Sequence, residues 1–345
     1  MNKKILMAAV GMALVAGPMV TAHAAGATLY GHLHMSMDRY DNDVNEDGMM
    51  ASNSSRFGIK GDEDLGGGLK SIYQVESGVF VADEGTSGFS GALRNTFMGF
   101  AGSWGVVKFG RHDTPYKDLG RKFDNFNEQV GDMRNFIGNA GAYDNRVSNM
   151  VRYESPNFSG LNVVVQNTSN NGSDAAANTA NKDTSLGLNW SSGPLFLGAA
   201  WNEVVNTGST NDTTGTRLAG AYTFNDITLG LLWESLSDIG GVSGRDRDAM
   251  GFVAAMKMGN NKFKFHYLDA DQLDDTANTG GDMLAIGVDH AFSKTTSVYF
   301  NYASVGNDTS AAFNTASSIG GHGDLLAAST GKDATAFSAG YIINF

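Results

Sequence analysis

Two histidines are the side chains of this sequence best placed for metal chemistry. His32 and His34 are two residues apart, and on a β-strand that spacing puts both imidazoles on one face. Two imidazoles so placed can begin a metal site. They serve equally well as uncharged polar groups lining a solvated face. We favour this second interpretation and expect neither a metal nor a cofactor.

Other chemical motifs are incomplete. The chain contains no Cys, which excludes disulfide-stabilised domains and Cys-ligated zinc or iron–sulfur centres. No G-x-S-x-G nucleophile motif occurs. The stretch Gly331-Lys332-Asp333 lacks the first glycine and the Ser/Thr of a phosphate-binding loop. We therefore expect that the protein is not an enzyme.

Composition narrows the class further. The 345 residues include 45 Gly but only 4 Pro, which favours many strands joined by tight turns. The 36 acidic residues exceed the 24 basic ones, for a net charge of -12. This acidity argues against nucleic acid as a partner. The chain also lacks the repeated apolar runs of about 20 residues that a helical membrane protein needs.

The first 24 residues have the features of an export signal. Lys3 and Lys4 precede an uncharged apolar stretch, Pro18 interrupts it, and Ala22-His23-Ala24 provides a small-x-small cleavage sequence. We expect residues 1–24 to be a signal peptide and residues 25–345 to form one domain.

The remaining chain alternates with a period of two, which is typical of strands. For example, Phe263, Phe265 and Tyr267 share one face, while Lys262 and Lys264 share the other. The sequence predicts sixteen strands, near 27–40, 53–64, 69–80, 92–102, 105–112, 145–155, 161–168, 183–191, 195–204, 215–224, 227–236, 246–258, 262–270, 282–291, 296–305 and 333–345.

The connections between these strands alternate in length. Seven short turns alternate with eight long polar loops, near 41–52, 81–91, 113–144, 169–182, 205–214, 237–245, 271–281 and 306–332. Short turns at one rim and long loops at the other are typical of outer-membrane β-barrels. Only helices and closed barrels pair every backbone group within a membrane. Sixteen strands leave an aqueous channel, so the strand count favours an all-β transmembrane antiparallel barrel that passes small polar solutes.

Four stretches resemble the trimeric general porins of Gram-negative outer membranes. They are 27–31, 55–69, 105–116 and 145–161, the last containing Tyr153-Glu154-Ser155-Pro156-Asn157-Phe158-Ser159-Gly160-Leu161. The chain also ends in Phe345, as such porins usually do. The resemblance implies a homotrimeric diffusion channel in the outer membrane of a Gram-negative bacterium, for small hydrophilic solutes and ions.

The resemblance also implies that the third long loop, 113–144, folds into the barrel and narrows the pore. Wall arginines would then face loop acids and set up a transverse field that biases ion passage. Alternation places Arg56, Lys60, Lys108 and Arg146 on the inward face. Arg94 is assigned to the wall by its motif position, although its strand carries the polar Asn95 on the presumed lipid side. The expected constriction residues are Arg56, Arg94, Arg146, Lys60 and Lys108 on the wall, and Asp124, Glu128 and Asp132 on the loop.

The last strand carries an apolar outward stripe of Tyr341, Ile343 and Phe345. Lipid contact accounts for it, and the resemblance adds a role as a signal for the outer-membrane insertion machinery. The expected partners are therefore further copies of the chain, outer-membrane lipid, this machinery and the solutes in transit.

Three alternatives remain open. A solute-selective or anion-selective porin would have the same fold. An outer-membrane barrel enzyme would need a Ser–His pair on the lipid face, but His32, His34 and His266 are all predicted to point inward. A secreted β adhesin would be soluble without detergent.

Overall fold

The computed structural model describes residues 26–81, 88–138, 143–168, 183–205, 211–316 and 320–345; the predicted signal peptide lies outside them. The first half of the barrel consists of β1 (Thr28–Asp41), β2 (Glu46–Ser52), β3 (Arg56–Gly66), β4 (Leu69–Phe80), β5 (Gly88–Leu93), β6 (Thr96–Gly102), β7 (Gly105–Asp113), β8 (Arg146–Glu154) and β9 (Leu161–Thr168). The second half consists of β10 (Asp183–Ser192), β11 (Leu195–Val204), β12 (Thr213–Phe224), β13 (Ile227–Ser237), β14 (Arg247–Met258), β15 (Asn261–Ala270), β16 (Gly281–Ala291), β17 (Thr296–Asn307) and β18 (Ala334–Asn344). The helices are α1 (Pro115–Phe123), η1 (Met133–Asn135) and η2 (Ile239–Gly241).

These eighteen segments form one closed antiparallel barrel of sixteen strands, because two of the barrel strands each consist of two segments. Except for β2 with β3 and β5 with β6, strands that are consecutive in sequence pair with each other, and β1 pairs with β18 to close the ring. The segments β2 and β3 together form one barrel strand with a short break, because both pair with β1. The segments β5 and β6 form another, because both pair with β4. The prediction of sixteen strands is therefore confirmed.

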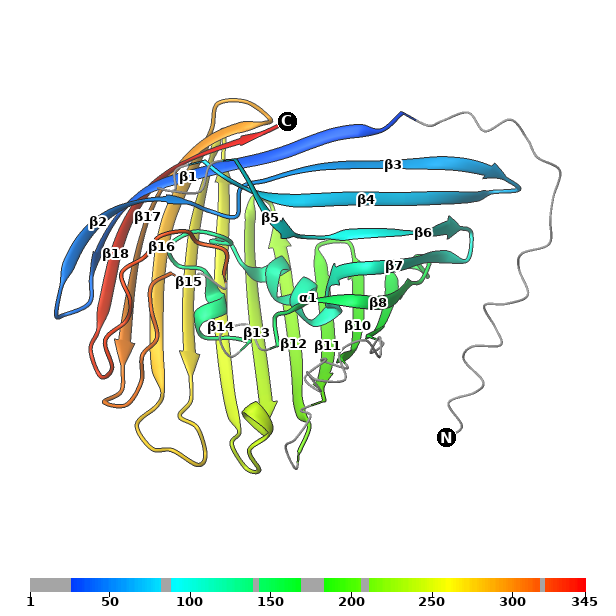
Figure 1. Ribbon diagram of the computed structural model, residues 1–345. Coiled ribbons are helices and arrows are strands. Elements are labelled where there is room, and N and C mark those ends of the chain that lie inside the picture. The colour runs from blue at the N-terminus through cyan, green and yellow to red at the C-terminus, as the bar shows by residue number, and fades with distance from the viewer. Residues whose placement is uncertain (1–25, 82–87, 139–142, 169–182, 206–210, 317–319) are drawn as a thin grey trace.

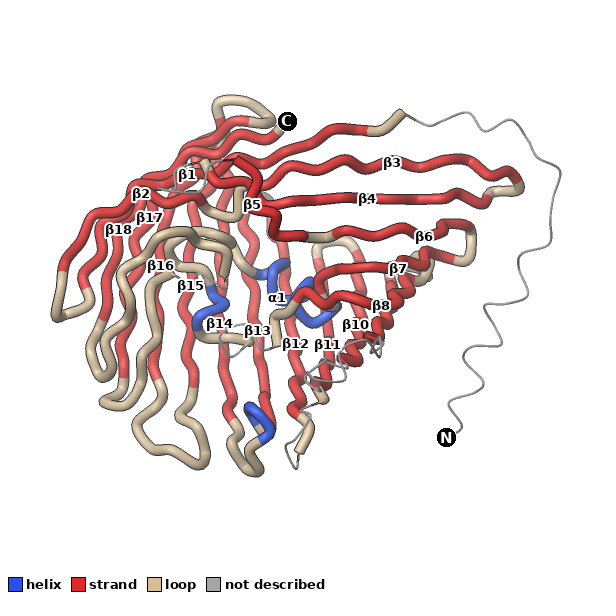
Figure 2. The backbone as a smooth tube through the Cα atoms, viewed as in Figure 1, coloured by secondary structure: helices blue, strands red, loops and turns tan. Residues whose placement is uncertain are grey.

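Two loop predictions need correction. The segment 41–52 is mostly strand, because β2 begins at Glu46 and only residues 42–45 turn the chain. Asn42 stabilises this turn through its side-chain oxygen, which accepts from the backbone N–H of Val44 and Asn45. The predicted loop 81–91 ends earlier than expected, since β5 begins at Gly88. The long connections gather at one end of the strands (Figure 2).

The outer face is apolar. On β13, Leu229 and Leu231 are exposed, while Leu232 and Glu234 are buried inside. The same alternation exposes Leu186 and Leu188 on β10. Large exposed apolar side chains on every second position fit a lipid-facing wall. Within the described residues, no helix has the length and apolar character to span a membrane.

The principal hydrophobic core lies inside the barrel. We call the connection between β7 and β8 L3. Its described residues, 114–138 and 143–145, fold inward (Figure 1). Its buried side chains include Tyr116, Leu119 and Phe123, which pack with Phe196 and Leu232 of the wall. A loop can remain ordered within an aqueous lumen only if it buries such apolar area against one side.

Candidate functional site: the charged neck between L3 and the wall

L3 begins with a short helix held against β10, β11 and β12. The Thr114 hydroxyl caps α1 by accepting from the backbone N–H of Lys117 at 3.3 Å, and Pro115 occupies the first turn. Glycines on the inner wall permit close approach. A Cβ on Gly187 would lie 2.9 Å from Pro115, and one on Gly230 would lie 3.0 Å from Phe123. Larger residues at either position would push the helix into the lumen.

A buried ionic cluster fixes the base of L3. Arg217 on β12 is fully buried, with its Nη1 2.8 Å from Asp144 of L3 and its Nη2 paired with Glu234 of β13. Glu234 also accepts from the hydroxyl of Tyr116 at 2.7 Å and from the backbone N–H of Gly138 at 2.7 Å. One cation on the wall therefore holds both ends of the loop.

The last long loop supports L3 from the opposite side. The backbone N–H of Gly131 donates to the carbonyl of Thr315 at 2.7 Å, and the side chain of Asn135 donates to the carbonyl of Asn314 at 2.7 Å. Arg134 further donates to the carbonyl of Gly320. L3 is thus clamped between the wall and a second inward-folded segment.

Glu128 is the L3 acid that faces the wall. Its carboxylate accepts from Nη1 of Arg56 at 2.9 and 3.0 Å. Nη2 of Arg94 lies 3.7 Å away and Nη2 of Arg121 lies 3.8 Å away. Burial is the largest single influence and would raise the pKa of Glu128, but Arg56, His32, Arg121 and Arg94 together outweigh it and hold that pKa well below its usual range. Glu128 is therefore a fixed anion at the neck.

Arg94 points inward because its strand is interrupted. Ser77 of β4 pairs with Leu93 of β5, and Gln74 of β4 pairs with Phe97 of β6. Three residue steps on β4 therefore lie opposite four steps on the β5–β6 side. This extra residue acts as a bulge and turns both Arg94 and Asn95 into the lumen. Arg94 Nε donates to Glu76 at 2.8 Å, and Glu76 also accepts from the Tyr30 hydroxyl at 2.9 Å.

Asp113 is a buried acid between the wall and L3 whose inward position alternation fails to predict. Its buried carboxylate lies 3.2 Å from Arg146 Nη2, 3.1 Å from Arg121 Nη1 and 3.2 Å from Lys117 Nζ. Strict alternation would place Asp113 on the lipid face with Phe109. A register shift lies beside it: β7 advances two residues from Gly110 to His112 while β8 advances three from Met150 to Val147, so β8 carries the extra residue of a bulge. Two residues with positive φ flank this bulge, Gly110 on β7 (φ 137°) and Asn149 on β8 (φ 55°).

Asp124 and Asp132 lie differently from expectation. Asp132 accepts from the guanidinium and the backbone N–H of Arg134, and from the backbone N–H of Glu128. Asp124 accepts from the backbone N–H of Phe126. Burial, followed by the neighbouring Asp132, raises the pKa of Asp124 well above its usual range. Both acids shape L3 internally and do not face the wall arginines, because L3 must satisfy its own buried turns.

Lys60 and Lys108 also stand apart from the contact between Glu128 and the wall. Lys60 is exposed, with its Nζ 5.1 Å from the centre of the Tyr30 ring. Lys108 pairs with Glu154 at 2.7 Å, and Glu154 also binds Arg152. Arg152 reaches Asp118 of L3 at 2.8 Å. This forms a second link between L3 and the wall, nearer the short turn after β8.

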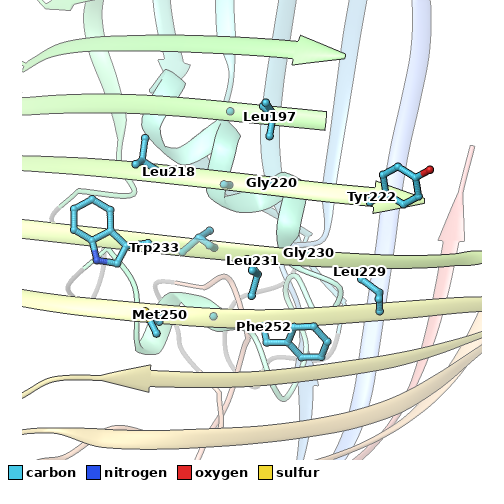
Figure 3. Close-up of a pocket in the computed structure, with 14 residues that line it drawn as sticks. Leu197, Leu218, Gly220, Tyr222, Leu229, Gly230, Leu231, Trp233, Met250 and Phe252 are labelled. Carbon is cyan, nitrogen blue, oxygen red and sulfur yellow. The ribbon is translucent and has the colours of Figure 1, made fainter. Parts of the chain in front are cut away.

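A large apolar hollow lies on the other side of the wall. Its volume is about 850 Å³, and side chains of β11–β14 line it, among them Leu197, Tyr222, Leu231, Trp233 and Phe252 (Figure 3). Several of these are the exposed outer-face residues. The hollow therefore belongs to the lipid-facing surface and contributes nothing to the neck.

Comparison with known proteins agrees with this architecture. The Gram-negative porin family matches residues 8–310. Outer membrane porin protein 32 of Delftia acidovorans is 28% identical over 323 residues, covering 88% of this chain and 90% of that protein. An outer membrane porin protein of Bordetella pertussis is 30% identical over 275 residues, covering 68% of this chain and 70% of that protein. The solved anion-selective porin from Comamonas acidovorans has a TM-score of 0.77 at 24% identity, covering 93% of this chain and 100% of that one.

A closed sixteen-stranded barrel with an apolar outer wall and an inward loop that meets charged side chains defines an outer-membrane channel. The chain belongs to the Gram-negative porin family. It resides in the outer membrane, forms a channel for small hydrophilic solutes, and is not an enzyme.

Proposed function

We propose that the neck between L3 and the wall selects solutes by size and charge, with a preference for small anions. Five cationic side chains, Arg56, Arg94, Lys117, Arg121 and Arg146, meet three carboxylates, Glu76, Asp113 and Glu128, in one connected set of ion pairs. Two positive charges are thus unbalanced at this neck. We call these eight residues the neck cluster.

The excess of cations is the observation that carries the proposal. Charges within a narrow passage bias ion selectivity more than distant surface charges, which salt screens over about 10 Å at 0.1 M. The net charge of -12 for the whole chain is therefore secondary to the local charge. Unpaired guanidinium N–H groups would also offer sites to carboxylate and phosphate groups of passing solutes.

Planar-bilayer recording under a potassium chloride gradient tests this preference. The expected reversal potential has the sign of chloride permeation, and its magnitude falls as the salt concentration rises. A reversal potential of the opposite sign would show that acids elsewhere control the pore. Silence from protein shown to be folded and inserted would reject an open channel altogether.

The assembly is part of the proposal. The resemblance to trimeric porins supports three copies per channel unit. Conductance steps grouped in threes and a chemically cross-linked species of three chains are the expected results. Independent single steps with no cross-linked trimer would overturn this assignment.

We also propose that Tyr341, Ile343 and Phe345 serve as the insertion signal. Tyr341 and Phe345 are exposed at the end of the closing strand. The Phe345 backbone pairs with Gly31 of β1 at 2.9 and 3.1 Å. Phe345→Ala keeps that backbone pairing, so the folded protein should be stable in detergent yet accumulate less in the outer membrane. Normal accumulation would remove Phe345 from the signal.

A further inference from the structure

A second site lies where β1 meets L3. His32 and His34 on β1 and Glu128 on L3 each offer one ligand atom, and these three atoms lie within 4.8 Å of one another. His32 Nε2 is 3.5 Å from Glu128 Oε2. The two imidazole rings stand edge to face, with centres 5.7 Å apart. The fold thus brings together a pair from one strand and an acid from a loop distant in sequence.

The hydrogen bonds of His32 leave one nitrogen free. His32 Nδ1 lies 2.7 Å from Asn344 Oδ1, an oxygen that only accepts, so Nδ1 carries the proton. His32 Nε2 then holds the lone pair. It is buried and has no hydrogen-bond partner among the described residues. A buried acceptor without a partner is rare and calls for a ligand.

His34 has the same arrangement. Its Nε2 lies 2.9 Å from the hydroxyl of Tyr299, and Asn53 Nδ2 approaches the same nitrogen at 3.5 Å. Its Nδ1 is buried with no hydrogen-bond partner among the described residues. The closer partner, the Tyr299 hydroxyl, can accept from Nε2–H, while Asn53 Nδ2 donates to Ser36 Oγ at 2.8 Å. In this tautomer the lone pair lies on Nδ1. The side chain is only 1% exposed, so water does not readily satisfy it.

This ligand set favours one class of ion. Two imidazole nitrogens and one carboxylate, with a fourth position left for water, are typical of Zn²⁺ and are also suitable for Cu²⁺ or Ni²⁺. Ca²⁺ and Mg²⁺ prefer oxygen ligands throughout. Metal–ligand bonds of about 2.0–2.1 Å in a tetrahedron separate ligand atoms by about 3.3 Å, which the 3.5 Å between His32 and Glu128 nearly matches.

Neighbouring groups orient all three ligands. Asn344 fixes His32, Tyr299 fixes His34, and Arg56 fixes Glu128. Such outer partners are usual around metal-binding histidines and carboxylates. Arg56, Arg94 and Arg121 also oppose a cation here, since each lies within 4 Å of a Glu128 oxygen. Arg56 Nη1 bonds both Glu128 oxygens, at 2.9 Å to Oε1 and 3.0 Å to Oε2. A metal on Oε2 must therefore displace the bond to that oxygen, while the bond to Oε1 can remain, so binding is weakened but not prevented.

We propose that His32, His34 and Glu128 form a binding site for Zn²⁺ or a similar divalent metal that links L3 to β1. Occupancy adds positive charge beside the neck cluster and restrains the L3 tip. Both effects raise the anion-to-cation permeability ratio and reduce fluctuations of the open current. The site lets the concentration of free metal modulate the pore.

Zinc titration of the purified, detergent-folded protein tests the site directly. Isothermal titration with zinc chloride should give one ion per chain, and Cu²⁺ should give an electron paramagnetic resonance signal from two nitrogen ligands. The variants His32→Gln and His32→Gln/His34→Gln should bind zinc at least about tenfold more weakly. His290→Gln is the matched control, because His290 contacts Asn261 and lies outside the cluster.

Folding of each variant is checked by its faster migration before heating. His32→Gln remains informative if loss of the more buried His34 impairs folding. In bilayers, zinc should shift the reversal potential of the wild type and of His290→Gln towards anions, and EDTA should reverse the shift. Absence of zinc binding to the wild type, or equal binding by the folded His32→Gln variant, would overturn the metal site. The conductance and selectivity without zinc test the proposed pore separately.

Discussion

Glu128 of L3 accepts two hydrogen bonds from a single nitrogen of Arg56 on β3, although 72 positions separate the two residues in sequence. This contact closes one side of the neck and fixes the distance between loop and wall. The carboxylate is buried and remains ionised because guanidinium groups surround it. A charge fixed in this way does not reorganise when an ion passes.

Charge reversal at Arg56 should alter selectivity strongly. Arg56→Glu replaces an excess of two positive charges in the neck cluster by an even balance, and it places two acids side by side. We expect a higher cation-to-anion permeability ratio, measured as the reversal potential in a salt gradient. Lys60→Glu is the matched control on the same strand, and it should have a smaller effect because Lys60 is exposed away from Glu128. An unchanged ratio in Arg56→Glu would remove Arg56 from the constriction.

The charge of Glu128 should persist in mild acid. Arg56 and its neighbours lower the pKa of Glu128 well below its usual range despite burial. A carboxyl whose pKa is lower in the folded state stabilises that state above its unfolded pKa of about 4.3, and the contribution is lost only as pH falls through the lower folded value. The difference in reversal potential between wild type and Glu128→Gln should therefore be the same at pH 7 and pH 4. A difference that disappears near pH 4.5 would contradict the buried ion pair.

Asp124 should respond to pH in the opposite sense. Burial and Asp132 raise its pKa in the folded protein, so the folded state holds a proton that the unfolded chain releases at a pKa of about 3.9. Stability is then lost as pH rises from that value towards the folded pKa. Asp124→Asn removes this loss, and its gain in thermal stability should be larger at pH 8 than at pH 4. Selectivity should not change. A clear selectivity shift would place the Asp124 charge in the lumen.

Loss of Arg217 should release the base of L3. Arg217→Met leaves Asp144 and Glu234 buried without their cation, which costs about 3–5 kcal/mol for a pair of this kind. The temperature at which the folded band converts to the slower heated band should fall, and the open current should become noisier. Arg39→Ala is the control: it removes an exposed ion pair with Glu46, and such a pair is worth about 0–1 kcal/mol. This variant should leave the conversion temperature and the current noise unchanged. Equal behaviour of the two variants would show that the Arg217 cluster does not anchor L3.

The inner and outer faces of β10 should differ in their access to water. The protein has no native Cys, so single cysteines can be labelled without background. On β10, Ser191 lines a polar hollow with Asp118 and Arg152, while Leu188 is exposed on the outer face. In lipid vesicles, a charged thiol reagent should label Ser191→Cys and leave Leu188→Cys unmodified. Labelling of Leu188→Cys alone would reverse the assignment of the two faces.

The barrel could be predicted from the sequence because strand patterning is local. Phe263, Phe265 and Tyr267 alternate with lysines in the sequence and occupy β15 in the structure. The sixteen strands, their order and the inward direction of Arg56 follow from such alternation and from short turns between neighbours. The turn at 42–45 was harder to predict, since polar residues of β2 resemble a loop when only composition is considered.

The neck depended on features that alternation does not encode. An extra residue of β8 opposite Gly110 shifts the pairing beside Asp113, and an extra residue near Arg94 brings both Arg94 and Asn95 into the lumen. Each shift of one residue reverses a strand face, and its position depends on pairing with a neighbouring strand. The sequence determined that this protein is a sixteen-stranded pore with a charged interior. Only the tertiary structure decided that Glu128, and not Asp124 or Asp132, meets the wall, because the path of L3 results from long-range packing against Phe196, Arg217 and Leu232.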